Sequence, residues 1–143
     1  MKPDLATLAR DLERYEGRRR TVYRCPQGKL TIGVGRNLED VGLSDEEIRV
    51  LLRNDISRIV VEAQREPWWP AVADDDVRAR ALLDMLFNLG LTRLRGFRKM
   101  LAAVQGRDWE TAARELEDSQ YFWQVGRRAR DNQYRIRYGR DPE

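Results

Sequence analysis

Hydrophobic residues at helical spacing mark the start of the chain. Leu5, Leu8, Leu12 and Tyr15 recur every three or four positions, which predicts an amphipathic helix over about residues 3–16. Gly17 follows directly and is expected to end that helix. From about residue 21 to 35 the pattern changes to β-branched and aromatic residues interrupted by Pro-Gln-Gly, so this segment predicts a small hairpin or sheet.

Helical patterns return for the rest of the chain. Ser44-x-x-Glu47 is a capping-box sequence and predicts a helix that continues to the Pro-Trp-Trp-Pro stretch at residues 67–70. Residues 76–89 are apolar nearly all round at their centre, which is typical of a helix inside its domain. Further helices are predicted over about 97–104, from an N-cap at Asp108 to 116, and over 120–138 with a break at Gly126.

These patterns predict a mainly helical α+β fold. The chain has 143 residues, so we expect one domain over residues 1–143. The small sheet is inserted after the first helix. We therefore expect a β lobe over about 17–38, a helical lobe over about 1–16 and 44–140, and a cleft between the two lobes.

Residues that are absent from the chain exclude several kinds of chemistry. The sequence contains no histidine and one cysteine. Catalysis by Ser-His-Asp or Cys-His is therefore excluded, as is nearly every zinc or non-haem iron site, and we expect neither a metal nor a cofactor. Acid–base chemistry then falls to carboxylates, tyrosine, lysine or Cys25.

Arginine dominates the basic residues. It accounts for 24 of 27, and the sequence pI is about 9.3. Six arginines lie between residues 127 and 140, which indicates either an anionic polymer of the cell envelope as a partner or a solvated helix face with local ion pairs. Nucleic acid is a weaker alternative, because no recognisable base-stacking platform accompanies these arginines.

The segment between the first helix and the hairpin is a candidate for the chemistry. Glu16 is expected at the C-terminal end of the first helix, where the helix dipole and partial desolvation both favour a protonated carboxyl group. That environment suits a general acid. The spacing Glu16-x8-Cys25-x5-Thr31 is weak evidence by itself, since each residue also has an ordinary structural explanation.

The complete string carries more information than the spacing. Tyr-Glu-Gly-Arg at 15–18, Tyr-Arg-Cys at 23–25 and Gly-Lys-Leu-Thr-Ile-Gly-Val-Gly at 28–35 resemble the active-site segment of the phage lysozymes, or endolysins, of glycoside hydrolase family 24. Asp-Met-Leu-Phe-Asn-Leu-Gly at 84–90 and the segment around 119–129 resemble the buried central helix and the late helices of that family.

The resemblance implies a two-lobed lysozyme-like fold and a hydrolase that cleaves the β-1,4 bond between N-acetylmuramic acid and N-acetylglucosamine in peptidoglycan. It implies Glu16 as the catalytic acid, with Cys25 and Thr31 placing or stabilising the attacking water. Its implied substrate-binding residues are Phe87, Asn88, Tyr121 and Arg128, the last of which would pair with Glu16.

Two positions depart from the best-known members of the family. Cys25 stands where they carry aspartate, and Arg36 stands where they carry histidine. A free thiol has an ordinary pKa of about 8.5 and is mostly neutral at pH 7. Arginines at 18–20 and 24 could lower that pKa. Alternatively, Cys25 only orients water together with Thr31.

Two alternative functions stay open at this stage. A lytic transglycosylase would use Glu16 alone and form an anhydro ring, and a binding module without activity would use the arginines. The sequence has no apolar segment typical of a signal peptide or a membrane span. We therefore expect a monomer that stays in the host cytoplasm until a separate holin releases it to the periplasmic peptidoglycan, or that is delivered within a virion.

Overall fold

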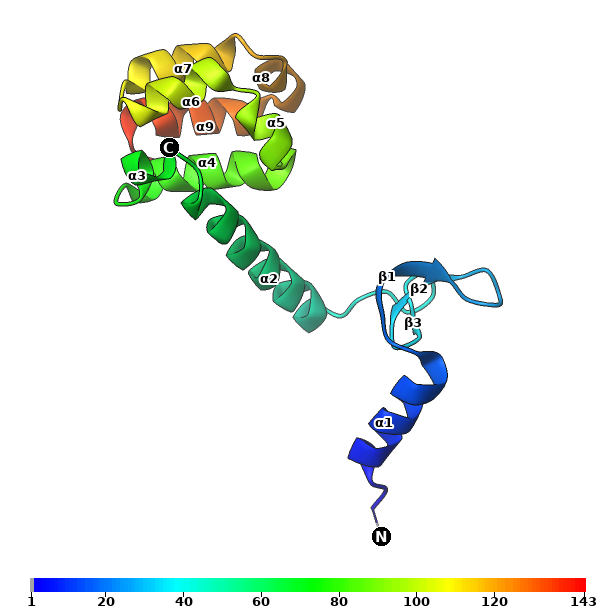
Figure 1. The fold of residues 1–143 in the computed structure, drawn as a ribbon. Helices are drawn as coiled ribbons and strands as arrows, with labels where there is room; N and C mark the ends of the chain where they lie inside the picture. Colours follow the sequence, from blue (N-terminus) through cyan, green and yellow to red (C-terminus); the bar gives the residue numbers. More distant parts are fainter. Residues whose placement is uncertain (1) are drawn as a thin grey trace. The chain divides into compact units, whose positions relative to one another are not determined.

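The computed structural model describes residues 2–143 and is mainly helical (Figure 1). Its helices and strands, in chain order, are α1 (Leu5–Glu16), β1 (Arg19–Arg24), β2 (Leu30–Gly33), β3 (Arg36–Asn37), α2 (Asp45–Gln64), α3 (Trp69–Val72), α4 (Asp76–Leu89), α5 (Leu91–Arg95), α6 (Arg98–Gln105), α7 (Trp109–Glu117), α8 (Gln120–Val125) and α9 (Arg127–Tyr138). The predicted α+β class is confirmed.

The chain divides into two compact units. The first unit ends at Leu51 and contains α1, the sheet and the first turns of α2, and the second runs from Leu52 to Glu143. Two predictions depend on how these units assemble. They are the cleft between the lobes and the assignment of residues 1–16 to a helical lobe. Both stay predictions. No helix within residues 2–143 is long and apolar enough to cross a membrane.

Helix α1 has well-defined ends. It begins at Leu5, slightly later than predicted, because the Asp4 side chain caps it by accepting a hydrogen bond of 3.1 Å from the backbone N–H of Thr7. Gly17 ends the helix with φ of +78°, and its N–H donates to the carbonyl of Glu13 at 2.9 Å. This positive φ favours glycine and leaves Glu16 in the final helical position.

The three strands form an antiparallel sheet in the order β1-β2-β3. Thr31 on the central strand lies opposite Tyr23 on β1 and opposite Asn37 on β3. Residues opposite one another in a sheet share a face, so these three side chains form one row across it. The predicted hairpin is therefore found, extended by a third short strand.

Glu47 links the sheet to the start of α2. Its carboxylate accepts from the backbone N–H of Ser44 at 2.9 Å, while the Ser44 hydroxyl accepts from the N–H of Glu47 at 3.1 Å, so the predicted capping box is confirmed. The same carboxylate lies 2.6 Å from Nη1 of Arg36 on β3. The hydrogen bond from Arg36 lowers the pKa of Glu47 to about 2.

This link gives the first unit an expected acid sensitivity. Because folding lowers the pKa of Glu47 from 4.5 to about 2, the ionised pair stabilises the unit fully above about pH 4.5 and loses that contribution as pH falls towards 2. Protection factors of the amides in the first turn of α2, which correct exchange for its intrinsic pH dependence, should fall across this window in the wild type and less so in Glu47→Gln. The control is Glu46→Gln, which removes a neighbouring carboxylate without an ion pair among residues 2–143. An unchanged acid response in Glu47→Gln would contradict this expectation.

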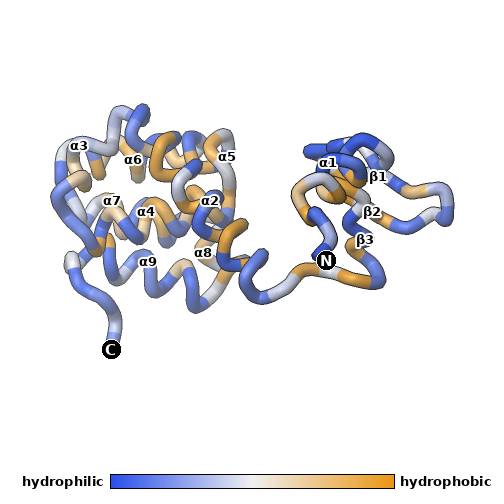
Figure 2. Tube along the Cα trace, turned by 90° about the horizontal axis from the view of Figure 1, so that it is seen from below, coloured by the Kyte–Doolittle hydropathy of each residue, from blue (hydrophilic) through white to orange (hydrophobic). Residues whose placement is uncertain are grey.

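The second unit is built around a helical core. Helix α4 matches its predicted boundaries and buries Leu82, Met85 and Leu86 almost completely. Helix α9 packs against it, α7 packs against α9, and α6 packs against α7. The segments of this unit alternate between hydrophobic and hydrophilic along their length in Figure 2. The N-cap at Asp108 and the break at Gly126 are confirmed.

Two short helices were missed by the sequence pattern. Helix α3 forms where only a helix end was predicted, since Pro70 is tolerated in the first turn of a helix, where its missing N–H has no partner to lose. Helix α5 follows Gly90 directly. Both helices are too short to show a hydrophobic period.

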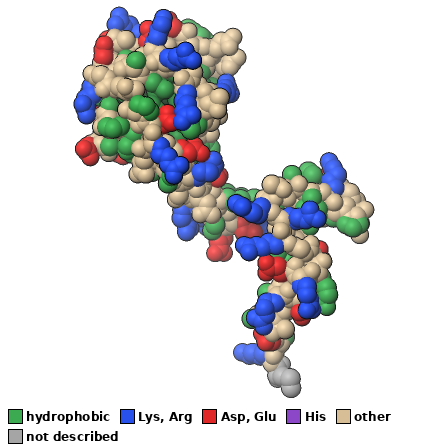
Figure 3. Space-filling model, in the orientation of Figure 1, with side chains coloured by type: hydrophobic (Ala, Val, Ile, Leu, Met, Phe, Trp, Pro, Cys, Tyr) green, Lys and Arg blue, Asp and Glu red, His purple; other side chains and the backbone are tan. Residues whose placement is uncertain are grey.

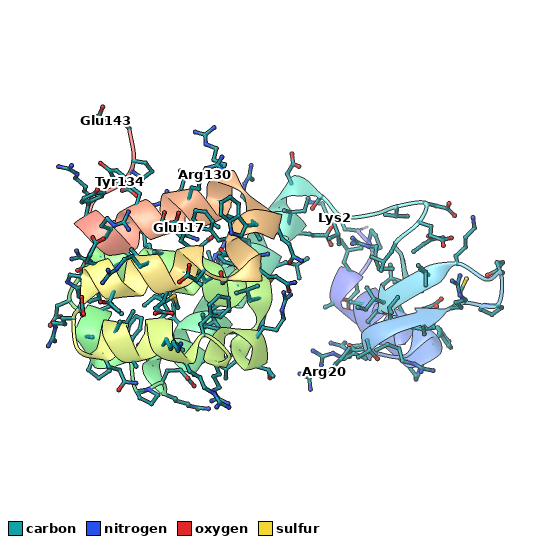
Figure 4. All side chains as sticks on the ribbon, turned by 90° about the horizontal axis from the view of Figure 1, so that it is seen from above. Lys2, Arg20, Glu117, Arg130, Tyr134 and Glu143 are labelled. Carbon is teal, nitrogen blue, oxygen red and sulfur yellow. The ribbon has the colours of Figure 1, made fainter. Side chains whose placement is uncertain are left out.

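Most of the late arginines have carboxylate partners. Arg127, Arg128, Arg135 and Arg137 lie within 4.0 Å of acidic side chains, and Arg140 lies over the rings of Tyr134 and Tyr138. Arg130 extends away from α9 (Figure 4). Lys and Arg side chains are interspersed with Asp and Glu in Figure 3. These contacts favour the alternative of local ion pairs, and an anionic polymer as a partner of this helix stays a prediction.

Candidate active site

The first unit contains a cavity of about 530 Å³ where the end of α1 meets the sheet. Glu16, Cys25 and Thr31, the three candidate catalytic residues, all line it. Its other lining residues are Tyr15, Tyr23, Pro26, Gln27, Gly35 and Asn37. The sequence therefore predicted correctly that the three residues lie together, although they come from a helix end, a turn and a strand.

Glu16 reaches the cavity from the last position of α1. Its carboxylate is held close to Gly35, in the turn between β2 and β3: a Cβ atom at Gly35 would lie 2.9 Å from Oε2 of Glu16. Gly35 also has φ of +66°. The carboxylate thus rests against bare backbone. The Glu16 side chain is exposed on the first unit, and its place at the negative end of the helix dipole is as predicted. Its partial desolvation, which depends on the assembly of the two units, stays a prediction.

Cys25 begins the turn that joins β1 to β2. Its carbonyl accepts from the N–H of Gly28 at 2.8 Å, and its N–H donates to the carbonyl of Lys29 at 2.9 Å. The thiol itself donates to Oε1 of Gln27 at 3.4 Å. The turn thereby fixes the direction of the sulfur.

The pKa of the Cys25 thiol lies below its ordinary value. The largest cause is a hydrogen bond with the backbone of Lys29, and a hydrogen bond with the backbone of Gln27 acts in the same direction. The neighbouring arginines, which the sequence offers as one way to lower this pKa, are not among its causes. Backbone N–H groups of the turn stabilise the thiolate instead.

Thr31 lies on the central strand and is 3% exposed. Its hydroxyl donates to the carbonyl of Lys29 at 2.9 Å. Because that bond uses the only proton of the hydroxyl, the oxygen can meet further partners solely as an acceptor. The sulfur of Cys25 is likewise free only to accept a hydrogen bond, since its proton is directed to Oε1 of Gln27.

Arg128 forms a cluster within the second unit. Its guanidinium group donates to both carboxylate oxygens of Asp84, at 2.9 and 2.8 Å, and Nδ2 of the buried Asn132 donates to Asp84 at 2.7 Å. Burial acts to raise the pKa of Asp84, but the hydrogen bonds from Arg128 and Asn132 outweigh it, so this pKa is lowered. The implied pairing of Arg128 with Glu16 involves both units and stays a prediction.

The other implied substrate-binding residues also lie in the second unit. Phe87 is exposed near the end of α4 and lines a hollow of about 550 Å³ together with Asp84 and Arg128. Asn88 is exposed beside it. Tyr121 is 3% exposed, and its ring packs edge-on against Phe97 at 5.9 Å between centroids. The roles of all these residues in substrate binding stay predictions.

Sequence reasoning missed several residues of the two sites. Tyr15, Tyr23 and Gly35 stood in the motif string without an assigned role. Gln27 and Asn37 carried no signal, because glutamine in a turn and asparagine at a strand end are common for purely local reasons. Asp84, the partner of Arg128, lies in the motif at 84–90, but the sequence assigns it no role.

The fold and the cavity together define a class of protein. A mainly helical α+β chain with a carboxylic acid in a cavity beside a small sheet is compatible with a glycoside hydrolase of the lysozyme type, which needs a carboxylic acid as proton donor. The sequence profile of the phage lysozyme family matches residues 13–131. The chain belongs to the phage lysozyme family and is an enzyme, a lysozyme that hydrolyses peptidoglycan.

Individual relatives are distant. The chain is 23% identical to "Probable T4-type lysozyme 1" of Dictyostelium discoideum, in an alignment that covers 87% of this chain and 91% of the relative. It is 29% identical to "Endolysin" of Acyrthosiphon pisum secondary endosymbiont phage 1, over 57% of this chain and 56% of the relative. It is also 28% identical to "Pre-baseplate central spike protein Gp5" of Enterobacteria phage T4, over 86% of this chain and 26% of the relative.

Proposed function

We propose that this lysozyme is an endo-acting N-acetylmuramidase that hydrolyses the β-1,4 bond between N-acetylmuramic acid and N-acetylglucosamine. The observation that carries the proposal is the meeting of Glu16, Cys25 and Thr31 around one cavity of the first unit. Glu16 is the sole carboxylic acid among the lining residues, so it is the proton donor in this proposal.

The first step is proton transfer from Glu16 to the glycosidic oxygen. The bond between that oxygen and the anomeric carbon then breaks, and positive charge develops on the sugar ring. Gly35 supports this step because its backbone leaves room for the Glu16 carboxylate and limits where it can lie.

Water attacks the anomeric carbon in the second step. The oxygen of Thr31 and the sulfur of Cys25 both have their own protons committed elsewhere, so each can accept one hydrogen of the same water molecule. A water held in this way directs a lone pair away from both groups and towards the substrate. We infer attack on the face opposite the leaving group, with inversion at the anomeric carbon. The water oxygen bonds to that carbon as the glycosidic bond breaks, and its surplus proton passes to solvent, from which Glu16 is protonated again.

The composition of the reaction products tests the proposal. Purified Gram-negative sacculi are digested with the wild type, and the fragments are analysed by mass spectrometry. The proposal expects reducing muramic acid ends. Anhydro-muramic ends would support instead the lytic transglycosylase, the second candidate, which needs Glu16 but neither Cys25 nor Thr31.

Substitution of Cys25 separates its chemical role from packing. We expect Cys25→Asp to keep most of the activity, since a carboxylate can also accept a hydrogen bond from water and stabilise positive charge. Cys25→Ala removes the acceptor and should lower the initial rate of sacculus clearing by about tenfold or more. A Cys25→Ala variant with the wild-type rate would show that the thiol only fills space.

A further inference from the structure

Two tyrosines border the cavity, and each carries an arginine on its ring. The guanidinium carbon of Arg14 lies 5.2 Å from the ring centroid of Tyr15, and that of Arg19 lies 5.0 Å from the ring centroid of Tyr23. Both rings line the cavity. These cation–π contacts place two positive charges beside the proposed catalytic groups.

The two arginines differ in their other partners. Nη2 of Arg14 lies 3.1 Å from a carboxylate oxygen of Asp11, so its charge is already paired. Within residues 2–143, no carboxylate lies within 4.0 Å of the Arg19 guanidinium group, and the Arg19 side chain donates no hydrogen bond. Its guanidinium group is exposed and is held in place by the Tyr23 ring.

The other arginines on β1 and just before it differ from Arg19 in their contacts. Arg18 lies 3.8 Å from Glu13, and Arg24 donates to the carbonyl of Gly28 at 2.9 Å. Arg20 extends away from the sheet (Figure 4). Arg19 is therefore the one cation of this strand that combines a contact to the wall of the cavity with an uncommitted guanidinium group.

Peptidoglycan carries the charge that such a group binds. Each muramic acid bears a lactyl ether, whose carboxyl group is either free or extended by a stem peptide that ends in carboxylates. A planar guanidinium group binds a carboxylate through two parallel hydrogen bonds. Stacking on Tyr23 restricts Arg19 beforehand, which reduces the entropy lost when the carboxylate binds.

We propose that Arg19 is a specificity-determining residue that binds a carboxylate of the lactyl or stem-peptide group while the glycan lies in the cavity of the first unit. The inference rests on the proposed function and names the part of the substrate that this side of the cavity selects. Arg19 does not take part in bond cleavage. Its loss should therefore raise KM and leave kcat nearly unchanged.

The test compares two substrates and two variants. The substrates are native sacculi and sacculi whose carboxylates have been converted to methylamides with carbodiimide and methylamine. The variants are Arg19→Gln and Arg20→Gln, which each remove one positive charge from the same strand. Initial rates of solubilisation are measured over a range of substrate concentrations for the wild type and both variants.

We expect Arg19→Gln to lower kcat/KM on native sacculi by about five- to tenfold, the effect of a partly exposed charge-assisted hydrogen bond. On amidated sacculi the same variant should match the wild type, and Arg20→Gln should match it on both substrates. Arg19→Lys keeps the charge without the planar fork and should lose less than Arg19→Gln. It also provides the comparison should Arg19→Gln fail to fold.

Three results would overturn the inference. An equal loss on both substrates would mean that Arg19 acts only through the packing of Tyr23. No loss on native sacculi, or an equal loss in Arg20→Gln, would remove any specific role. Failure of the folded wild type to cleave native sacculi would instead refute the proposed function itself, which distinguishes the two failures.

Discussion

Glu16→Gln is expected to lower the rate of sacculus hydrolysis by about 10²–10⁴-fold, the usual contribution of a general acid. The amide keeps the size of the side chain and its place against Gly35 but has no acidic proton to transfer. Because Glu16 is exposed at the end of α1, the substitution should leave folding and thermal stability close to the wild type. The rate is measured as turbidity loss under identical conditions for both proteins.

The matched control for this experiment is Glu13→Gln. Glu13 lies on the same helix, is also exposed, and lies 3.8 Å from Arg18. Glu13→Gln removes one negative charge from the same helix, and Glu13 does not line the cavity, so this variant should retain wild-type activity. A Glu16→Gln variant that still clears sacculi at the wild-type rate would refute the assignment of Glu16.

Gly35→Ala is expected to remove most activity through the position of Glu16. The new Cβ would lie 2.9 Å from Oε2 and 3.1 Å from the carboxyl carbon of Glu16, so the carboxylate must move. A displacement of about 1 Å at a catalytic group costs on the order of 10²-fold in rate. The φ of +66° at Gly35 adds strain of about 1–2 kcal/mol to the folded state.

Gly33→Ala separates these two effects. Gly33 has a similar φ of +70°, but nothing lies within 4 Å of where its Cβ would stand. The two variants should lose similar stability in urea unfolding, whereas only Gly35→Ala should lose kcat per folded molecule. Equal losses of kcat in both variants would mean that backbone strain, rather than contact with Glu16, controls the site.

The candidate site was predictable where it depends on neighbours in the sequence. The period of Leu5, Leu8 and Leu12 together with Gly17 predicted that Glu16 would end a helix, and the structure confirms this. The alternation of strand and turn residues after it predicted a hairpin that carries Cys25 and Thr31. Each of these features depends on interactions over a few residues, which local patterns encode well.

The cause of the lowered pKa at Cys25 was not predictable in this way. Arginines nearby in sequence suggested a charge effect, yet the sulfur lies against backbone N–H groups of its own turn. The direction of a backbone N–H depends on the turn geometry, and many sequences produce the same turn. The close approach of Gly35 to Glu16 could not be predicted for a related reason. Neither the φ of Gly35 nor its distance from a residue 19 positions earlier produces a recognisable pattern in the sequence.

The sequence alone determined the α+β class, the boundaries of α4, the caps at Ser44 and Asp108, and the motif that identifies the family. Periodicity, capping and motif spacing depend on residues close together in the sequence, so they do not depend on how the segments are arranged in space. The tertiary structure alone decided which groups meet: Glu16 with Gly35, Arg36 with Glu47, and Arg128 with Asp84. These contacts join residues 11 to 44 positions apart, and their partners are selected by packing and charge in space, which no single segment of sequence specifies.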